Sequence, residues 1–368
     1  LERATERVYD RDIGEFITRA RQVPVLINYS VGNKRYEKKP DEYDLELIRK
    51  IEESEIPYWY PTDRMPEGDE SRRNDPLGIT HVHHFYTRRN LWILAALSQL
   101  INATKLPFQK KLEFLRQSYN ATHSTLMTRI IFKKGQKPLL TGNQSGTLYV
   151  SSLPVEKNII LGLRNMKIDL IKSALQKVHL SSIVSTQSAT SMHEIAENMI
   201  DYIFTDPPFG GNLMYSELNF LWEAWLKVFT NNKPEAVENK AQGKGPREYQ
   251  ELMEKCFAEY YRVLKPGRWM TVVFHNSQNR IWNAIQEAIM RAGFVIADIR
   301  ILDKKHGTFK QISSFNAVKQ DLVISAYKPN GGLEKRFHLE AGTEEGVWDF
   351  VRTHLRQLPV FVEKNGKA

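Results

Sequence analysis

The stretch Ile200-Asp-Tyr-Ile-Phe-Thr-Asp-Pro-Pro-Phe209 decides what fold this chain is predicted to adopt. Together with Met199, its first six residues form a short apolar run of strand length, 199–205, and the run stops at an Asp-Pro-Pro turn. Two consecutive prolines fix φ and make that turn rigid. The sequence therefore predicts a strand that presents a carboxylate, Asp206, and an aromatic ring, Phe209, at its carboxyl end.

The residues on the carboxyl side of this stretch alternate between helical and strand patterns. Strands separated by helices of this length pair in parallel, so we expect an α/β sheet. The last two strands have no helix between them and should pair antiparallel. Helices are predicted over 216–229, 248–264 and 280–292, and strands over 269–274, 294–302 and 321–327, with a stop at 265–267 between helix and strand.

The first 180 residues are less regular and predict an irregular α+β region that serves as an insertion or contacts the substrate. We expect three regions: 1–180, a catalytic subdomain at 181–330, and a C-terminal extension at 331–368. Within the first and last regions, helices are predicted over 86–101, 158–178 and 347–358, and strands over 127–132 and 147–151 around a Gly-rich turn at 141–146.

Composition and charge narrow the class of protein. The chain is 41% hydrophobic and 26% charged, which is typical of a soluble globular protein. No uninterrupted apolar run of about 18 residues is present, so no membrane span is predicted. One cysteine, Cys256, excludes an internal disulfide and a Cys-based zinc site, and it fits the reducing cytoplasm. Lys and Arg exceed Asp and Glu by 52 to 43, which favours a phosphate-bearing partner such as nucleic acid.

The residues from Asp206 to Phe209 suit the methylation of an exocyclic amine. The lone pair of such an amine is conjugated into the ring, so the nitrogen is a weak nucleophile. Hydrogen-bond acceptors for both N–H groups orient the amine and favour a lone pair directed toward a methyl donor. Asp206 offers a carboxylate and Pro207 a carbonyl, both held in place before charge develops. Pro208 completes the rigid turn, and Phe209 offers a π-face for an extruded base. The alternative is that Asp-Pro-Pro is only a rigid turn.

These residues resemble the amino-methyltransferases of DNA, whose motif is Asp, Asn or Ser, then Pro-Pro, then Tyr, Phe or Trp. Asp in the first position is typical of adenine enzymes. Over about residues 20–330 the chain is similar to large DNA methylases that carry Phe-Tyr-Thr-x-Arg-Asn-Leu upstream, here residues 85–91. The other similar segments are 185–190, 212–218 and 263–267.

The resemblance implies a fold, a cofactor and a substrate. The fold would be the Rossmann-like sheet of class I methyltransferases, of which this chain holds the catalytic half. The cofactor would be S-adenosyl-L-methionine, and the substrate adenine in DNA, as in restriction–modification. Gln187 and Ser188 would lie near the cofactor's adenine, and Asp206 would also contact the cofactor. Tyr86 and Thr87 are further cofactor candidates, although Thr87 is also suited to cap a helix.

One family signature is not found in this sequence. The motif Phe-x-Gly-x-Gly lets backbone approach the methionine end of the cofactor closely. Residues 142–146 are Gly-rich but lack the strand-to-helix context and the acidic residue expected one strand later. We therefore expect an N-terminal segment before Leu1, or a second chain, to supply this turn, and we expect the chain alone to bind the cofactor weakly.

Several other residues and the function itself leave alternatives open. The target could be cytosine, RNA or protein, or the chain could be a nucleic-acid-binding module that does no chemistry alone. His81, His83 and His84 suggest either a metal or a structural cluster, without a nearby carboxylate pattern to support a metal. His275 could line the site or cap the strand, and residues 304–310 could face DNA or form a solvated hairpin tip. Trp222 and Trp225 lie on an apolar helix face that predicts core packing.

Overall fold

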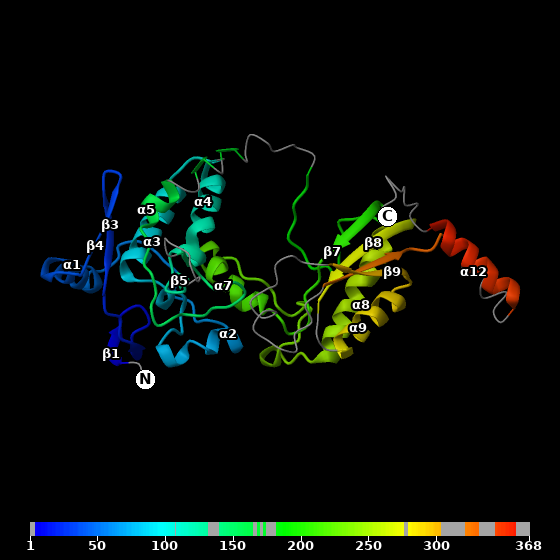
Figure 1. Cartoon of the computed structure of the whole chain (residues 1–368), viewed down its shortest axis with the longest axis horizontal. Helices are drawn as coiled ribbons and strands as arrows, with labels where there is room; N and C mark the ends of the chain where they lie inside the picture. The colour runs from blue at the N-terminus through cyan, green and yellow to red at the C-terminus, as the bar shows by residue number, and fades with distance from the viewer. Residues whose placement is uncertain are drawn as a thin grey trace. The chain divides into compact units, whose positions relative to one another are not determined.

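The computed structural model describes residues 4–106, 108–131, 140–164, 168–169, 172–173, 182–275, 279–302, 321–330 and 343–357. They belong to two compact units (Figure 1). Unit 1 consists of Leu1–Ile183 and Met214–Thr230, and unit 2 of Val184–Leu213 and Asn231–Ala368. The chain thus returns to unit 1 for a short segment before it completes unit 2. The three regions expected from the sequence stay a prediction. In the described part of the chain, no helix has the length and apolarity needed to cross a bilayer.

Unit 1 combines antiparallel β-ribbons with helices. Each of the pairs β1–β2, β3–β4 and β5–β6 is antiparallel. Its elements are β1 (Thr5–Asp10), β2 (Glu15–Ala20), β3 (Ile27–Val31), β4 (Lys34–Lys38), α1 (Glu42–Glu53), α2 (Asp69–Arg72), η1 (Asp75–Leu77), η2 (Val82–Phe85), α3 (Arg88–Asn102), α4 (Phe108–His123), β5 (Arg129–Ile131), β6 (Leu140–Gly142), α5 (Ile159–Gly162) and α7 (Tyr215–Leu226).

The core of unit 1 lies between α3, α4 and α7. Leu91, Leu94 and Ala95 recur at helical spacing on α3 and are buried. Trp225 of α7 is buried as predicted, and the guanidinium of Arg116 stacks over its ring at 4.7 Å. A helix that is distant in sequence, α7, therefore completes the core of the N-terminal region.

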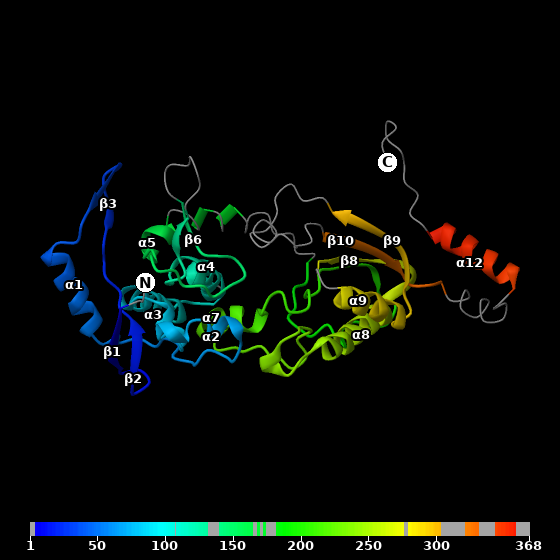
Figure 2. The same ribbon diagram turned by 60° about the horizontal axis from the view of Figure 1, so that its bottom comes forward.

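Unit 2 contains a mixed four-stranded sheet in the order β7-β8-β10-β9. Strands β7 (Ile200–Thr205) and β8 (Leu264–Phe274) pair in parallel, and β9 (Val295–Leu302) pairs antiparallel with β10 (Asp321–Tyr327), as predicted. Strands β8 and β9 are separated in sequence by a helix but do not pair with each other, because β10 lies between them and is antiparallel to both. Helices α8 and α9 lie on one face of the sheet (Figure 2). The elements are β7 (Ile200–Thr205), η4 (Lys240–Gln242), α8 (Pro246–Val263), β8 (Leu264–Phe274), α9 (Asn279–Arg291), β9 (Val295–Leu302), β10 (Asp321–Tyr327) and α12 (Glu344–Gln357).

Two of the predicted elements differ from the structure. Residues 147–151 form no strand, and β5 pairs instead with β6, which overlaps the start of the predicted turn. The reason is that side chains satisfy the backbone there: the N–H of Leu148 donates to Glu70 and its carbonyl accepts from Asn74, each at 2.9 Å. The predicted stop at 265–267 is part of β8, whose pairing with β7 shifts register between Ile200 and Tyr202.

Other predictions lie partly or wholly outside the described residues. Of the helix predicted over 158–178, the structure describes α5 and a few residues after it. Residues 304–310 lie outside the described part altogether.

The two faces of the unit 2 sheet differ in exposure. Met270, Val272 and Phe274 of β8 are completely buried, on the face that carries α8 and α9. Tyr202 and Phe204 of β7, on the other face, are 54% and 64% exposed. Among the described residues, no strand pairs with the outer edge of β7.

Candidate active site

The Asp-Pro-Pro-Phe motif follows directly on β7, at the carboxyl end of a strand that pairs in parallel with β8. Asp206 is exposed, Pro207 is buried, and Pro208 and Phe209 are half-buried. Gly210 has φ of +66°, a left-handed conformation that favours glycine and lets the chain leave the turn. The rigid turn and its carboxylate therefore lie at the edge of the sheet where α/β proteins bind ligands.

A helix of unit 2 holds this turn through one of its carbonyls. The hydroxyl of Tyr249, on α8, donates to the carbonyl oxygen of Pro208 at 2.7 Å. Tyr249 is completely buried. Sequence reasoning placed this residue on a helix but gave it no function, because its spacing from Met253 and Phe257 indicates only a core position.

The ring of Phe209 packs against the core of unit 2. It meets Phe274 edge to face, with 5.4 Å between ring centroids, and its centroid lies 6.1 Å from that of His275. His275 is itself fixed, because its Nδ1 lies 3.1 Å from a carboxylate oxygen of the buried Asp321. The structure thus places His275 beside the motif, as the prediction of a site-lining position requires.

The two candidate residues for the cofactor's adenine precede β7 in the same unit. Gln187 is exposed and Ser188 is half-buried. The hydroxyl of Ser188 lies 2.8 Å from that of Thr190 and accepts from its N–H, which makes a local turn. Their role in cofactor binding stays a prediction.

Helix α8 anchors the segment that follows Ser188. The N–H of Met192 donates to Glu259 at 2.7 Å, and Arg262 donates to the carbonyl of Ile195 at 2.9 Å. Hydrogen bonds from Arg262 and from the Met192 N–H lower the pKa of Glu259 to about 2. The carboxylate therefore stays charged at neutral pH and keeps this segment on the same helix that holds the Asp-Pro-Pro-Phe turn.

Tyr86 and Thr87 belong to unit 1, at the start of α3. Thr87 caps that helix, since its hydroxyl accepts from the N–H of Asn90. Tyr86 is buried; its hydroxyl donates to Asn120 at 2.6 Å and accepts from the indole of Trp225 at 3.0 Å. Burial raises the pKa of the Tyr86 hydroxyl. Both residues thus have structural roles within unit 1, and their contact with a cofactor stays a prediction.

The histidines before α3 have a carboxylate partner that the local sequence did not reveal. Asp10, on β1, accepts from Nε2 of His83 at 2.9 Å and of His84 at 2.6 Å. Three such groups could in principle hold a metal. However, Nδ1 of His84 accepts from the backbone N–H groups of Thr80 and His81. The imidazole proton of His84 is therefore on Nε2, the atom that faces Asp10, whereas a metal at that position would need a lone pair there. The three side chains thus form a hydrogen-bonded cluster that joins β1 to η2.

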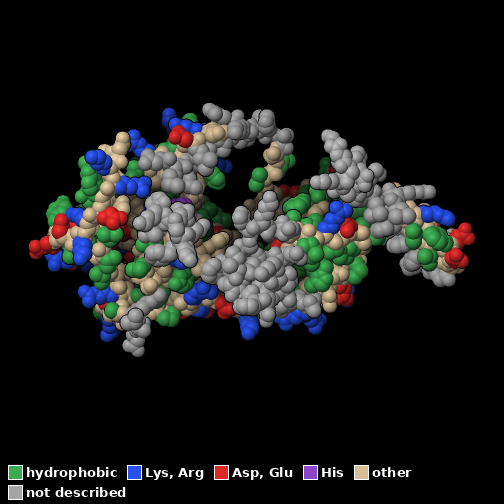
Figure 3. All heavy atoms as spheres, in the orientation of Figure 1, with side chains coloured by type: hydrophobic (Ala, Val, Ile, Leu, Met, Phe, Trp, Pro, Cys, Tyr) green, Lys and Arg blue, Asp and Glu red, His purple; other side chains and the backbone are tan. Residues whose placement is uncertain are grey.

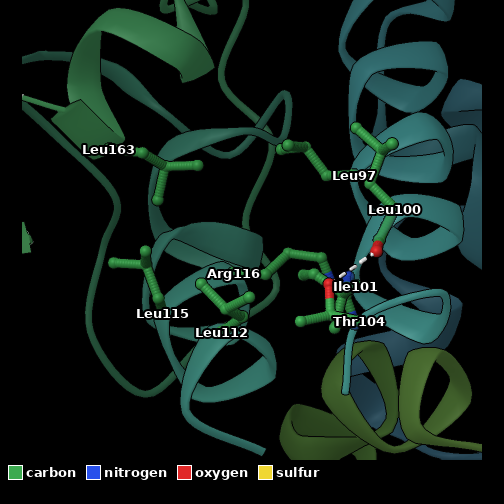
Figure 4. A pocket seen from close by; sticks show the side chains of 8 residues that line it. All are labelled: Leu97, Leu100, Ile101, Thr104, Leu112, Leu115, Arg116 and Leu163. Atoms are coloured by element: carbon green, nitrogen blue, oxygen red, sulfur yellow. Dashed lines mark hydrogen bonds between the residues drawn. The ribbon is translucent and has the colours of Figure 1, made fainter. Parts of the chain in front are cut away.

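Unit 1 also contains an apolar cavity of about 190 Å³ between α3, α4 and α5 (Figure 4). Leucine and isoleucine provide most of its wall, and Thr104 donates to the carbonyl of Leu100 at 2.9 Å. This lining does not suit a nucleoside, which needs several polar partners. The lining residues are Leu97, Leu100, Ile101, Thr104, Leu112, Leu115, Arg116 and Leu163.

The net positive charge is not concentrated on the face seen in Figure 3. There, basic and acidic side chains of the described residues are interspersed. Charge alone therefore does not mark a nucleic-acid surface on that face.

The region that contains the Asp-Pro-Pro-Phe motif is similar to a known protein family. Residues 200–357 match the DNA methylase family. The match begins with β7 and includes the Asp-Pro-Pro-Phe turn, α8, β8 and Tyr249. The resemblance to DNA methylases is thereby confirmed for this part of the chain. No curated protein matches the sequence.

Solved structures similar to this chain include methyltransferases. A candidate DNA modification methylase from Thermus thermophilus is 15% identical, over 39% of this chain and 53% of its own, with a TM-score of 0.23. A structure of the same protein with S-adenosyl-L-methionine has a TM-score of 0.22 at 14% identity, over 39% and 56%. A SAM-dependent methyltransferase from Methanosarcina mazei is 13% identical, over 44% and 77%, with a TM-score of 0.24. The matched part of this chain spans about half the length of the Thermus protein.

Proposed function

We propose that this chain provides the catalytic motif of a DNA methyltransferase that methylates the exocyclic amine of adenine. The observation that carries the proposal is the position of Asp206-Pro-Pro-Phe209. A carboxylate and a rigid turn follow a strand at the ligand-binding edge of the sheet, within the segment that matches DNA methylases. Cytosine and RNA are the alternative substrates for the same chemistry.

In this proposal, the residues of the turn act on a base that has left the helix stack. The exposed carboxylate of Asp206 accepts one N–H of the amine, and the carbonyl of Pro207 accepts the other. The carbonyl of Pro208 is a less suitable acceptor, because Tyr249 already donates to it. Phe209, held by Phe274, supports the base by stacking.

The reaction is a direct transfer without a covalent bond to the enzyme. When bound, S-adenosyl-L-methionine would supply an electrophilic methyl group to the amine nitrogen, with S-adenosylhomocysteine as the leaving group and the amine proton lost to water. Gln187 and Ser188 offer an amide and a hydroxyl that suit the cofactor's adenine. The sequence provides no Gly-rich turn for the methionine end, so these residues fit only part of the cofactor.

We propose that an N-terminal segment or a partner chain supplies the Gly-rich turn. The outer edge of β7 is unpaired among the described residues, and Tyr202 and Phe204 beside it are largely exposed. An unpaired edge offers backbone N–H and C=O groups to a further strand. Parallel sheets are normally covered on both faces, so the exposed face of β7 suits an element that would cover it. We also assign the protein to the cytoplasm, in agreement with its single, buried cysteine, Cys256.

The decisive experiment measures methyl transfer by the protein together with the segment that supplies the turn. Transfer of labelled methyl groups to DNA and to RNA is followed by separation of the nucleosides. Asp206→Ala should lower turnover about a hundredfold or more, because a preorganised acceptor is lost. Asp201→Ala is the matched control: Asp201 is an exposed acid on the same unit, and its ion pair with Lys265 at 2.9 Å lies at the surface.

Each result bears on a different part of the proposal. Label in N6-methyladenine from DNA supports it, whereas label in N4-methylcytosine or in RNA assigns the alternative substrate. Near wild-type turnover by Asp206→Ala would refute the role of the motif.

A further inference from the structure

We propose that Tyr249 is a positioning residue that fixes ψ of Pro208, the one backbone rotation within the Pro207-Pro208 pair that the prolines leave free, and this inference rests on the proposed function. The hydroxyl of Tyr249 donates to the Pro208 carbonyl at 2.7 Å, from a side chain with no exposed surface.

The prolines restrict most of the turn by covalent structure. Their rings fix φ of Pro207 and Pro208. A residue that precedes proline is confined to extended ψ, which restricts ψ of Asp206 and ψ of Pro207. Pro208 is followed by Phe209, so nothing in the sequence restricts its ψ. That single rotation decides the direction of the Pro208 carbonyl and the position of Phe209.

Neither proline has an N–H group, so the turn has no backbone donor of its own at these two positions. The Pro208 carbonyl and the Phe209 N–H belong to one peptide plane, so a donor to that carbonyl restricts ψ of Pro208. Tyr249 is such a donor. Its hydrogen bond fixes the plane of the peptide between Pro208 and Phe209.

Helix α8 gives the Tyr249 hydroxyl a defined position. The helix begins at Pro246, and the N–H of Gly245 donates to the side chain of Glu248 at 2.8 Å, which closes its first turn. Tyr249 continues the buried stripe with Met253 and Phe257, so its ring is held by the core whether or not the hydroxyl is present. The ring therefore contributes to packing, and the hydroxyl is left to hold the turn.

The test compares Tyr249→Phe with Tyr261→Phe in the active protein. Tyr261 is the matched control because it lies on the same helix and packs half-buried against Phe294, with 5.2 Å between ring centroids. We expect Tyr249→Phe to lower kcat about 10- to 100-fold, since small misplacement of reacting groups has effects of that order. KM for DNA and for the cofactor should change less than about threefold, and Tyr261→Phe should resemble the wild type.

A second measurement does not depend on methyl transfer. It therefore tests whether Tyr249 holds the turn even if the protein proves not to be a methyltransferase. Hydrogen–deuterium exchange of peptides covering residues 209–214 should be about fivefold faster or more in Tyr249→Phe, since one hydrogen bond is lost. Exchange elsewhere in α8 should be unchanged. Wild-type exchange of this segment in Tyr249→Phe would overturn the positioning role, as would a wild-type kcat. A loss of kcat with an equal loss of folded protein would also overturn it, by indicating packing alone.

Discussion

Substitutions of Phe209 distinguish stacking on a target base from packing within the protein. Alanine removes both the ring and its volume, leucine keeps most of the volume without a π-face, and tyrosine keeps the π-face. If the ring stacks on an extruded base, Phe209→Leu should be as impaired in methyl transfer as Phe209→Ala. Its folding free energy should nevertheless be close to that of the wild type. Tyrosine should be close to the wild type in both.

The structure sets the expected size of each effect. Complete burial would make Phe→Ala cost about 3–5 kcal/mol of folding free energy. Phe209 is half-buried against Phe274, so we expect about 2 kcal/mol for alanine and about 1 kcal/mol or less for leucine. Loss of a base–aromatic stack is worth about 1–3 kcal/mol. That corresponds to a fall in kcat/KM of about 5- to 150-fold for both alanine and leucine.

Two assays separate these terms. Urea unfolding gives the folding free energy of each variant, and methyl transfer to DNA under conditions where all variants are folded gives kcat/KM. If Phe209→Leu keeps the wild-type kcat/KM, the ring serves only the core of unit 2, and the proposed contact with a base is wrong.

Two further predictions concern the stability of unit 1. Burial and the neighbouring His83 lower the pKa of His84 to about 4, against about 6.5 in an unfolded chain, so the fold favours the neutral imidazole. The contribution of this histidine to the free energy of unfolding should be fully present above about pH 6.5 and should fall by up to about 3 kcal/mol as the pH drops toward 4. Equal free energies from urea unfolding at pH 7.5 and at pH 5 would contradict this. Gly68→Ala should lower the unfolding free energy by about 1–3 kcal/mol, because the added Cβ would lie 2.0 Å from a carboxylate oxygen of the buried Glu217; an unchanged thermal midpoint would show that Glu217 can move aside.

The sequence predicted elements whose signals are local. Strand β7 and the turn after it were visible because an apolar run ends at two prolines, and the pairing of β9 with β10 followed from the missing helix between them. The hairpin of β3 and β4 was missed, although Gly32-Asn33 between two strand-like runs is a turn signal. Gly32 indeed has a positive φ of 57°.

Contacts between distant parts of the chain had no such signal. Asp10 lies 73 residues from His83, so a search for nearby carboxylates could not find it. Helix α7 follows the motif closely in sequence but packs in unit 1, where its Glu217 accepts from the N–H of Ser71 at 2.7 Å. Amphipathic spacing predicts that a helix has a buried face, and it does not say which core receives that face.

The candidate site shows the same division within a single turn. Proline rings and the restrictions they impose on preceding residues are covalent, so the rigidity of Asp206-Pro-Pro could be read from the sequence. Within the Pro207-Pro208 pair they leave one rotation open, ψ of Pro208, and Tyr249, 41 residues later, donates to the carbonyl that this rotation orients. A motif search therefore finds the groups that act on a substrate and misses the hydroxyl that orients them. Because Tyr249→Phe removes only that hydroxyl and leaves the motif intact, it can show how much of the site's geometry comes from tertiary structure rather than from the motif itself.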